Sequence, residues 1–537
     1  MRARAVHGSY LSITLVGHSF GAVLARKIAI VAYGEQAGAD NDIPAPFEVE
    51  LSALRQPRSW APLIGRIVLM AGMNRGWSTS SAMDWFTSAK WSFMQVACEI
   101  SMRGKPTILA IRRGAPFLVQ TRLQWLAMMD PQYGPRPNLI VAQLLGTSDD
   151  HVSPDDNVDY SVDLYCNRDR QSYFYLEVPA SNHPNVVEMS TFGPSATAVA
   201  RAKRRDTFLT AFSADRAQLA TASISRDQMA DNLPPLPDPD VTDVVFVVHG
   251  IRDKGFWTQK VARTIKRQAA PGQKFESWTE SYGYFAMMPF MLRAVRQRKV
   301  EWLMDRYVEA RARYPRARMH FVGHSNGTYL GAQALQDYPS ARFKRMVFAG
   351  SVVRCDYDWL DLIAPGPNSV NRRARVGQVL NYVATADWVV ALFPNGVQPW
   401  RRFNLGSAGH DGFTQGHVDG PVHQVNYIVG GHGVGHEEEN WKDIAQFVVN
   451  GVAPTLHHPQ FSQAQSKLWR VMGSASAYLL PLFVCLVVAI GLLLFVSMFV
   501  AYELDAGLHP TTTSAALLHA LYFAVYATAI RMLVTRF

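Results

Sequence analysis

Two serines of this sequence lie inside the pentapeptides GHSFG and GHSNG, which run from Gly17 to Gly21 and from Gly323 to Gly327. Both match Gly-x-Ser-x-Gly, a spacing that places the serine on a tight turn between a strand and a helix and exposes its hydroxyl as a nucleophile. At ordinary glycine and serine frequencies, a chain of this length would hold only about 0.2 chance matches. An apolar run precedes each pentapeptide and a helix-forming stretch follows it, so Ser19 and Ser325 are candidate nucleophiles.

A nucleophilic serine needs a histidine as general base, an acid that orients the base, and N–H donors for the oxyanion. After Ser325 the chain offers Asp387, just past an expected strand, and then His432 and His436 in one loop before the last expected helix. His432 follows its strand by a short step and is the preferred base, and His436 is the alternative. Asp387 could also be a simple turn cap. The rival acids follow an earlier strand and are Asp356, Asp358 and Asp361.

The first copy offers the same roles in the same order. Asp149 follows a strand expected at residues 138–145, with Asp150 as the adjacent alternative. His183 follows a strand expected at residues 173–178 and is the expected base. Ser19, Asp149 and His183 are therefore the first candidate triad.

These motifs resemble the α/β-hydrolase superfamily over residues 1–212 and 243–451, and the GHS elbows fit its lipase and esterase branch best. HGIRDKGFW, which begins at His249, is similar to the oxyanion loop of that family. The resemblance implies the N–H groups of Ile251 and Asn326 as oxyanion donors, with Phe20 in the place of Asn326 in the first copy. LIVAQLLGTSDDHV, which begins at Leu139, is similar to the acid turn of the family.

The resemblance also implies that three or four strands and an oxyanion loop precede each elbow. Residues 1–18 are too few for one strand-helix unit, so we expect the first copy to be incomplete, either through a misplaced start or a fragment, or as a decayed copy that serves structure. His7 and Gly8 lie too close to Ser19 to replace the missing loop.

Near-continuous apolar runs alternate with helix-forming stretches in both halves, which predicts an α/β fold with mostly parallel sheets. Expected strands are residues 12–16, 66–71, 138–145, 173–178, 243–248, 318–322, 344–348, 378–384 and 424–429. Expected domains are residues 1–230 and 244–455, divided by a Pro- and Asp-rich linker at 231–243. Aromatic and methionine-rich stretches are predicted to be core or a lid over an acyl pocket: Trp77, Trp85, Phe86, Trp91, Phe93 and Met94 in the first half, and Phe285, Met287, Met288, Phe290 and Met291 in the second.

At 537 residues and 48% hydrophobic content, the chain can hold two domains with full cores. The net charge is +10, but the bases are interspersed with acids and no nucleic-acid motif accompanies them, so no nucleic-acid partner is expected. The densest basic run, Arg201 to Arg205, is predicted to be a solvated helix face or a contact for an anionic membrane. The four cysteines lack ligand spacing, and His410, His417 and His423 also lack it, so we predict no metal site and no cofactor.

Residues 474–502 contain no charged side chain and are long enough to cross a hydrocarbon core of about 30 Å. A second run at 514–534 is interrupted mainly by His519 and Arg531. We expect a transmembrane helical hairpin after the two soluble domains, with no signal peptide at the start. Lys467, Arg470, Arg531 and Arg536 flank its ends, which predicts that both ends and the soluble domains face the cytoplasm.

The sequence thus favours a membrane-tethered serine esterase or lipase that acts on a lipid or other acyl-ester substrate. A non-catalytic membrane scaffold built on the same folds is the alternative from another class. A thioesterase or peptidase with the same triad is not separable from an esterase by these residues.

Overall fold

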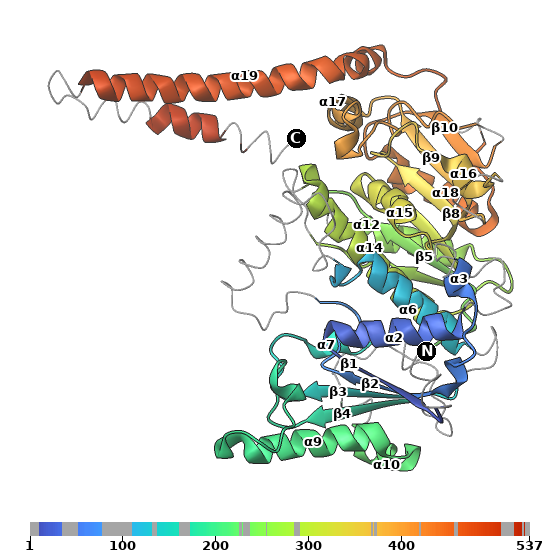
Figure 1. The fold of residues 1–537 in the computed structure, drawn as a ribbon. Helices are drawn as coiled ribbons and strands as arrows, with labels where there is room; N and C mark the ends of the chain where they lie inside the picture. Colours follow the sequence, from blue (N-terminus) through green and yellow to red (C-terminus); the bar gives the residue numbers. More distant parts are fainter. Residues whose placement is uncertain are drawn as a thin grey trace. The chain divides into compact units, whose positions relative to one another are not determined.

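The computed structural model describes residues 10–34, 52–77, 110–130, 137–159, 172–224, 228, 237–253, 255–283, 290–366, 369, 373–417, 420–455, 460–505, 520–528 and 531 (Figure 1). The chain forms two compact units. The first unit comprises Met1–Thr242 together with Arg298–Arg318 and Ala334–Arg342. The second unit comprises Asp243–Gln297, Met319–Gln333 and Phe343–Phe537. Each unit is built around one sheet.

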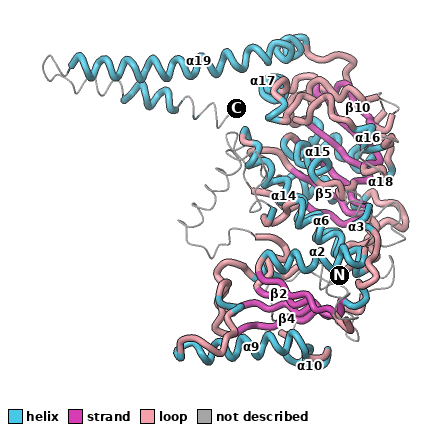
Figure 2. Tube along the Cα trace, viewed as in Figure 1, coloured by secondary structure: helices cyan, strands magenta, loops and turns pink. Residues whose placement is uncertain are grey.

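The sheet of the first unit has the order β1-β2-β3-β4 and is parallel throughout. Figure 2 shows its strands between helix α2 on one face and helices α9 and α10 on the other. Alternate strand residues point to the two faces, so Ile67 packs with the α2 side and Val68 with the α9 side. The elements are β1 (Ile13–His18), α2 (Phe20–Tyr33), α3 (Ser52–Arg55), β2 (Ile64–Met70), α6 (Pro116–Met129), β3 (Ile140–Gly146), α7 (Pro154–Asn157), β4 (Tyr173–Val178), α9 (Ala198–Ser213) and α10 (Arg216–Ala222).

The second unit contains a sheet of order β10-β9-β8-β7-β5-β6, which is parallel in the pairs β5–β6, β7–β8, β8–β9 and β9–β10. Helices α12 and α18 cover one face, where Val261 and Ile444 pack against the strand residues Val245 and Val322. The elements from residue 243 onward are β5 (Asp243–Val248), α12 (Phe256–Arg267), β6 (Phe275–Trp278), α14 (Arg293–Arg313), β7 (Arg318–His324), α15 (Asn326–Asp337), β8 (Phe343–Ala349), α16 (Trp359–Ile363), β9 (Val376–Ala384), α17 (Trp388–Val397), β10 (Val422–Ile428), α18 (Trp441–Asn450) and α19 (Lys467–Asp505). Of these, α14 from Arg298 onward and the end of α15 from Ala334 belong to the first unit.

The predicted α/β class with mostly parallel sheets is confirmed. Every expected strand is present, with ends shifted by no more than two residues. The short strand β6 was not expected, because FESW carries little apolar pattern in a strand of four residues. Residues 231–236 of the expected linker at 231–243 lie outside the described residues, and its last residue, Asp243, begins β5.

The basic run on α9 does not form the solvated face expected for it. Arg201 and Arg204 are buried, and Lys203 is exposed. Arg204 donates to Ser181 Oγ at 2.8 Å, and Arg201 donates to the carbonyl of Ser190 at 2.9 Å. These guanidinium groups reach back over the loop after β4, because an arginine stem can pack along the helix while its head bonds loop oxygens.

An ion-pair network is buried inside the first unit. Asp305 of α14 pairs with Arg75 at 2.9 Å, Arg122 at 2.7 Å and Arg113 at 3.0 Å. One turn earlier on α14, Glu301 pairs with Arg112 at 2.6 Å. Residues four apart lie on the same face of a helix, so one face of α14 presents acids to the buried arginines of this unit.

One helix in the described part of the chain is long and apolar enough to cross a membrane, Lys467–Ser497 within α19. Its apolar side chains are largely exposed, as Leu492, Leu493 and Phe495 illustrate. Of the expected second span, residues 520–528 are helical and most of the rest lies outside the described residues. The structure therefore supports one candidate span where the sequence predicted a hairpin.

Candidate active sites

Both candidate nucleophiles lie on the turn between a strand and a helix. Ser19 joins β1 to α2 with a φ of 54°, and Ser325 joins β7 to α15 with a φ of 52°. A positive φ is costly for a residue with a side chain, so the packing of each turn must hold it. A Cβ on Gly17 would come within 2.3 Å of the carbonyl oxygen of Gly21, and one on Gly327 within 2.4 Å of that of Val248. The two glycines permit this close packing.

The first copy forms a hydrogen-bonded relay from serine to acid. His183, in the loop after β4, places Nε2 at 3.0 Å from Ser19 Oγ and Nδ1 at 3.2 Å from Asp149 Oδ2. The N–H groups of His151 and Val152 donate to Asp149 Oδ1. Burial raises the pKa of Asp149, but the hydrogen bonds from His183, Val152 and His151 outweigh it and hold that pKa below its usual value. The acid is therefore ionised and aimed at the base.

The alternative acid of the first copy lies apart from this relay. Asp150 is exposed and contacts the ring of His151 at 2.6 Å. Phe20, the expected oxyanion donor, is the first residue of α2, where a backbone N–H has no partner within the helix. His7 and Gly8 lie outside the described residues.

The acid and base of the second copy are also paired. Asp387 is fully buried at the start of α17, where its Oδ1 accepts from the N–H of Val390 at 3.0 Å. His432 follows β10 and places Nδ1 at 2.9 and 3.0 Å from the two oxygens of Asp387. Asp387 therefore caps the helix and orients an imidazole at once, so the two roles that the sequence left open do not exclude each other.

The alternatives for these roles have other partners. Asp356 pairs with Arg354 at 2.7 Å, and Asp358 caps α16 by accepting from the N–H of Asp361. His436 lies against the rings of His324 and Trp257, with ring centroids 3.9 and 4.6 Å apart. Burial lowers the pKa of His436 to about 4, with smaller opposed effects from Asp253 and His432.

Within the described residues, no hydrogen bond joins Ser325 Oγ to the candidate base His432. The N–H of Ser325 donates to the carbonyl of Ala349, and a Cβ on the next residue, Gly350, would come within 2.9 Å of His432 Nδ1. Catalytic hydrogen bonds are often long or poorly aligned without substrate, so the absence of this bond does not rule out His432 as the base of Ser325.

The loop after β5 lies directly beside Ser325. A Cβ on Gly250 would come within 2.8 Å of Ser325 Cβ. The carbonyl of Gly250 accepts from Tyr282 Oη at 2.7 Å and contacts His249 Nδ1 at 2.8 Å. The carbonyl of Gly250 and the N–H of Ile251 belong to one trans peptide group and point in opposite directions. The N–H of Ile251 therefore points away from Tyr282 and His249.

Tyr282 joins this loop to Asn326, the residue whose N–H is the other expected oxyanion donor. Its hydroxyl also contacts the carbonyl of His249 at 3.0 Å and accepts from Asn326 Nδ2 at 3.1 Å. Burial raises the pKa of Tyr282 well above its usual range, so the hydroxyl stays protonated. Sequence reasoning placed Tyr282 at the start of the second aromatic stretch and gave it no role at the site, because no local pattern links it to Gly250 or Asn326.

The histidine that precedes each serine plays the same part in both copies. His18 Nε2 lies 2.9 Å from the carbonyl oxygen of His183, and His324 Nε2 lies 3.3 Å from that of His432. A carbonyl oxygen only accepts, so Nε2 must donate in both cases. Each of these histidines thereby ties the elbow to the loop that carries the base.

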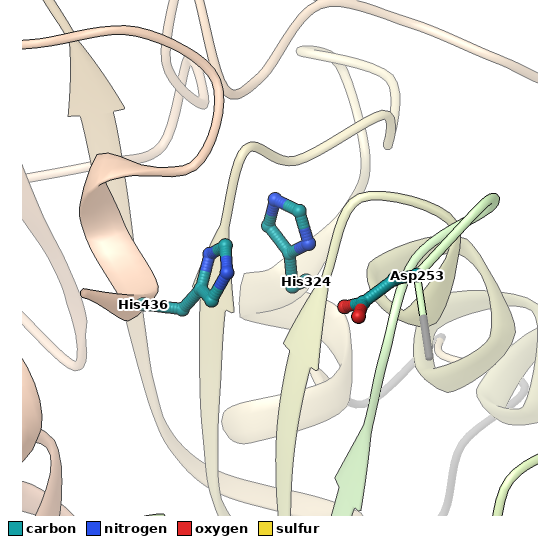
Figure 3. A group of neighbouring side chains, drawn as sticks. All are labelled: Asp253, His324 and His436. Carbon is teal, nitrogen blue, oxygen red and sulfur yellow. The ribbon is translucent and has the colours of Figure 1, made fainter. Parts of the chain in front are cut away.

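A second polar group adjoins the second copy. Asp253, His324 and His436 each offer a nitrogen or carboxylate oxygen, and these atoms lie within 4.8 Å of one another (Figure 3). Asp149, Asp150 and His151 form another such group, which is more exposed. Neither group has regular ligand spacing, so nothing in the sequence indicated that these side chains lie together.

Only part of the two expected lid stretches is described. Trp77 is buried, donates to the carbonyl of His151 at 3.0 Å and packs with Met73 and Val152. Phe290 is buried beneath the guanidinium of Arg296. These two aromatics belong to the core. Trp85, Phe86, Trp91, Phe93, Met94, Phe285, Met287 and Met288 lie outside the described residues.

No family model matches this chain, and no curated protein matches its sequence. The function must therefore be argued from the two sites themselves.

Proposed function

We propose that this chain is a membrane-anchored serine hydrolase of the α/β-hydrolase type that cleaves carboxylic esters, with lipid-like esters as its natural class of substrate. One repeated observation carries the proposal. In both sheets, a serine held at positive φ between a parallel strand and a helix is accompanied by a histidine and an aspartate that contact each other at 3.2 Å or less. This is the arrangement that nucleophilic serine chemistry needs, and it occurs twice.

The second copy supports turnover best, because it also has a loop beside the serine. In the proposed reaction, Ser325 Oγ attacks the ester carbonyl carbon while His432 Nε2 takes the hydroxyl proton. The N–H groups of Ile251 and Asn326 donate to the oxyanion. His432 then returns the proton to the leaving alcohol oxygen, and water attacks the acyl-enzyme with the same histidine as base. Asp387 stabilises the imidazolium throughout.

The C-terminal helix supports the choice of lipid-like substrates. A span of this length holds the catalytic unit at a bilayer, where ester lipids are concentrated. Residues 520–528 pack back on α19, since Tyr526 Oη donates to the carbonyl of Val487 at 2.7 Å. We propose that they belong to a second span, with Lys467, Arg470 and the soluble units on the cytoplasmic side.

Hydrolysis of p-nitrophenyl esters of increasing acyl length, by the full chain in detergent, tests this function. We expect Ser325→Ala to lower kcat by at least about 1,000-fold, because the nucleophile is lost. We expect Ser19→Ala to have a smaller effect. Ser462→Ala is the control, since its Oγ donates only to the backbone of Ala464. Full turnover by the Ser19→Ala, Ser325→Ala double variant would contradict the proposal.

A further inference from the structure

Three side chains from three different segments converge beside the second candidate triad. Asp253 lies in the loop after β5, His324 is the last residue of β7, and His436 lies in the turn before α18. Figure 3 shows the carboxylate and the two imidazole rings turned toward a common point. Carboxylate oxygen and imidazole nitrogen are ligands that Zn²⁺ binds in proteins.

The hydrogen bond of His324 determines which of its nitrogens is available. Nε2 donates to the carbonyl of His432, so the neutral ring carries its lone pair on Nδ1. Nδ1 is buried and has no hydrogen-bond partner within the described residues, and the residue as a whole is only 8% exposed. A buried polar atom without a partner is unfavourable, and a metal ion bound at Nδ1 would give it one.

The other two ligands are held in place and keep free lone pairs. Asp253 accepts from the N–H of Gly255 at 2.8 Å and from Trp257 Nε1 at 2.6 Å. A carboxylate has about four acceptor positions, so these bonds orient Asp253 and leave room for a cation. His436 Nδ1 is also buried without a hydrogen-bond partner in the described part of the chain.

We propose that Asp253, His324 and His436 form a binding site for one divalent transition-metal ion, with Zn²⁺ as the best match. Two nitrogens and one oxygen, with a fourth position open to water, are a common ligand set for this ion. Zinc ligands at about 2.0–2.2 Å stand about 3.3–3.6 Å from one another. Ligand atoms within 4.8 Å reach that spacing through small side-chain rotations.

Such an ion would connect the three loops of the proposed hydrolase site. Asp253 is two residues from Ile251, His324 is next to Ser325, and His436 is in the same loop as His432. A single ion bound to all three would fix the oxyanion loop, the nucleophile and the base relative to one another. The site goes beyond the proposed function, because binding requires no catalysis.

A zinc titration of the full chain in detergent, in competition with a chromophoric chelator, tests the site. We expect one Zn²⁺ per chain in the intact protein. Loss of a second-shell partner alone weakens metal sites by about 10–100-fold, so His436→Ala and Asp253→Asn should weaken binding by about 100-fold or more. Co²⁺ in place of Zn²⁺ should give the visible absorption of a four-coordinate site in the intact chain, and this absorption should be absent from His436→Ala and Asp253→Asn.

His151→Ala is the matched control, because His151 belongs to the other group of possible ligands. It should bind Zn²⁺ as the intact chain does. Zn²⁺ should also raise the midpoint of thermal unfolding of the intact chain and of His151→Ala, and leave that of His436→Ala unchanged. Asp253→Asn keeps the shape of the side chain, so it remains informative if His436→Ala does not fold. The proposal is overturned by an intact, folded chain that binds no stoichiometric Zn²⁺, or by binding that is lost in His151→Ala and kept in Asp253→Asn.

Discussion

At the scale of single residues, both sites rely on side chains that hold a loop rather than react. His18 and His324 each donate to the backbone carbonyl of the histidine proposed as base. Tyr282 holds the loop after β5, which carries a proposed oxyanion donor. Its hydroxyl contacts the carbonyls of His249 and Gly250 and accepts from Asn326. These bonds fix the groups that must be in place before the substrate arrives.

Tyr282→Phe should therefore slow ester hydrolysis at Ser325 and leave the protein folded. Loss of an oxyanion donor itself costs about 100–1,000-fold in kcat, so loss of a residue that only positions the donors should cost about tenfold. Steady-state kinetics on a p-nitrophenyl ester, in a Ser19→Ala background, would measure this effect as a fall in kcat with little change in KM.

Tyr382→Phe is the control for this change. The hydroxyl of Tyr382 is buried and makes no hydrogen bond to any described residue, so its removal should leave kcat unchanged and should not lower stability. Equal kinetics for Tyr282→Phe and the unmodified chain would show that Tyr282 does not support the proposed donors.

At the scale of elements, helix α14 supplies acids to the arginines of the first unit. Burial by itself raises the pKa of Asp305, but Arg75, Arg113, Arg122 and Arg306 outweigh it and hold that pKa well below its usual range. A carboxylate with a depressed folded-state pKa contributes stability above its unfolded pKa of about 3.9, and this contribution declines as the pH falls below that value. The first unit should therefore become less stable as the pH falls below about 5.

Asp305→Asn should destabilise the first unit by about 1–3 kcal/mol, because Arg75, Arg113 and Arg122 lose one buried charged partner each and keep only the acids Glu309, Asp156 and Asp159. The loss should be largest at neutral pH and should shrink as the pH falls below about 3.9, where the carboxylate of the unfolded chain becomes protonated while that of the folded chain is still ionised. Denaturant unfolding at several pH values would measure it. Glu188→Gln is the control: Glu188 is 61% exposed and lies 3.7 Å from Arg204, so its loss should cost less than about 1 kcal/mol. Equal unfolding free energies for the two variants would contradict the importance of the network.

The sequence predicted the elements far better than the contacts between them. Apolar runs predicted the strands, and the Gly-x-Ser-x-Gly pentapeptides predicted both strand-to-helix turns. Each of these signals lies within a few consecutive residues. The sequence favoured His432 over His436 as the partner of Asp387 from its position in the loop, but the contact itself is seen only in the tertiary structure. The links from α14 to Arg75 and Arg122, and the meeting of Asp253 with His436, join residues that are distant in sequence. No local pattern could have indicated them.

At the scale of the whole molecule, the candidate membrane helix α19 packs against α17, which begins directly after the proposed catalytic acid. Asn395 of α17 donates to the carbonyl of Gly473 in α19 at 3.1 Å, and a Cβ on Gly396 would meet Leu480 at 3.0 Å. Asp387 caps α17, so the start of α19 packs against the helix that carries the candidate acid. The rest of α19 contains the candidate membrane span.

A chain that ends after Leu480 would separate these two roles. It keeps the α19 residues that contact α17 and lacks most of the apolar span. We expect it to be recovered without detergent, to hydrolyse soluble esters at the rate of the full chain, and to lose most of its activity on esters embedded in vesicles. A chain that ends after Asp505 keeps all of α19 and is the control. Full activity of the shorter chain on vesicle esters would remove the reason given for the anchor.

The most direct test of the central claim is labelling by a fluorophosphonate probe, which reacts with serines activated by a base. The intact chain in detergent, Ser19→Ala, Ser325→Ala and the double variant would be compared. The account predicts labelling of the intact chain, loss of most of it in Ser325→Ala, a smaller loss in Ser19→Ala and none left in the double variant. Absence of labelling in an intact, folded chain, or undiminished labelling of the double variant, would contradict the account.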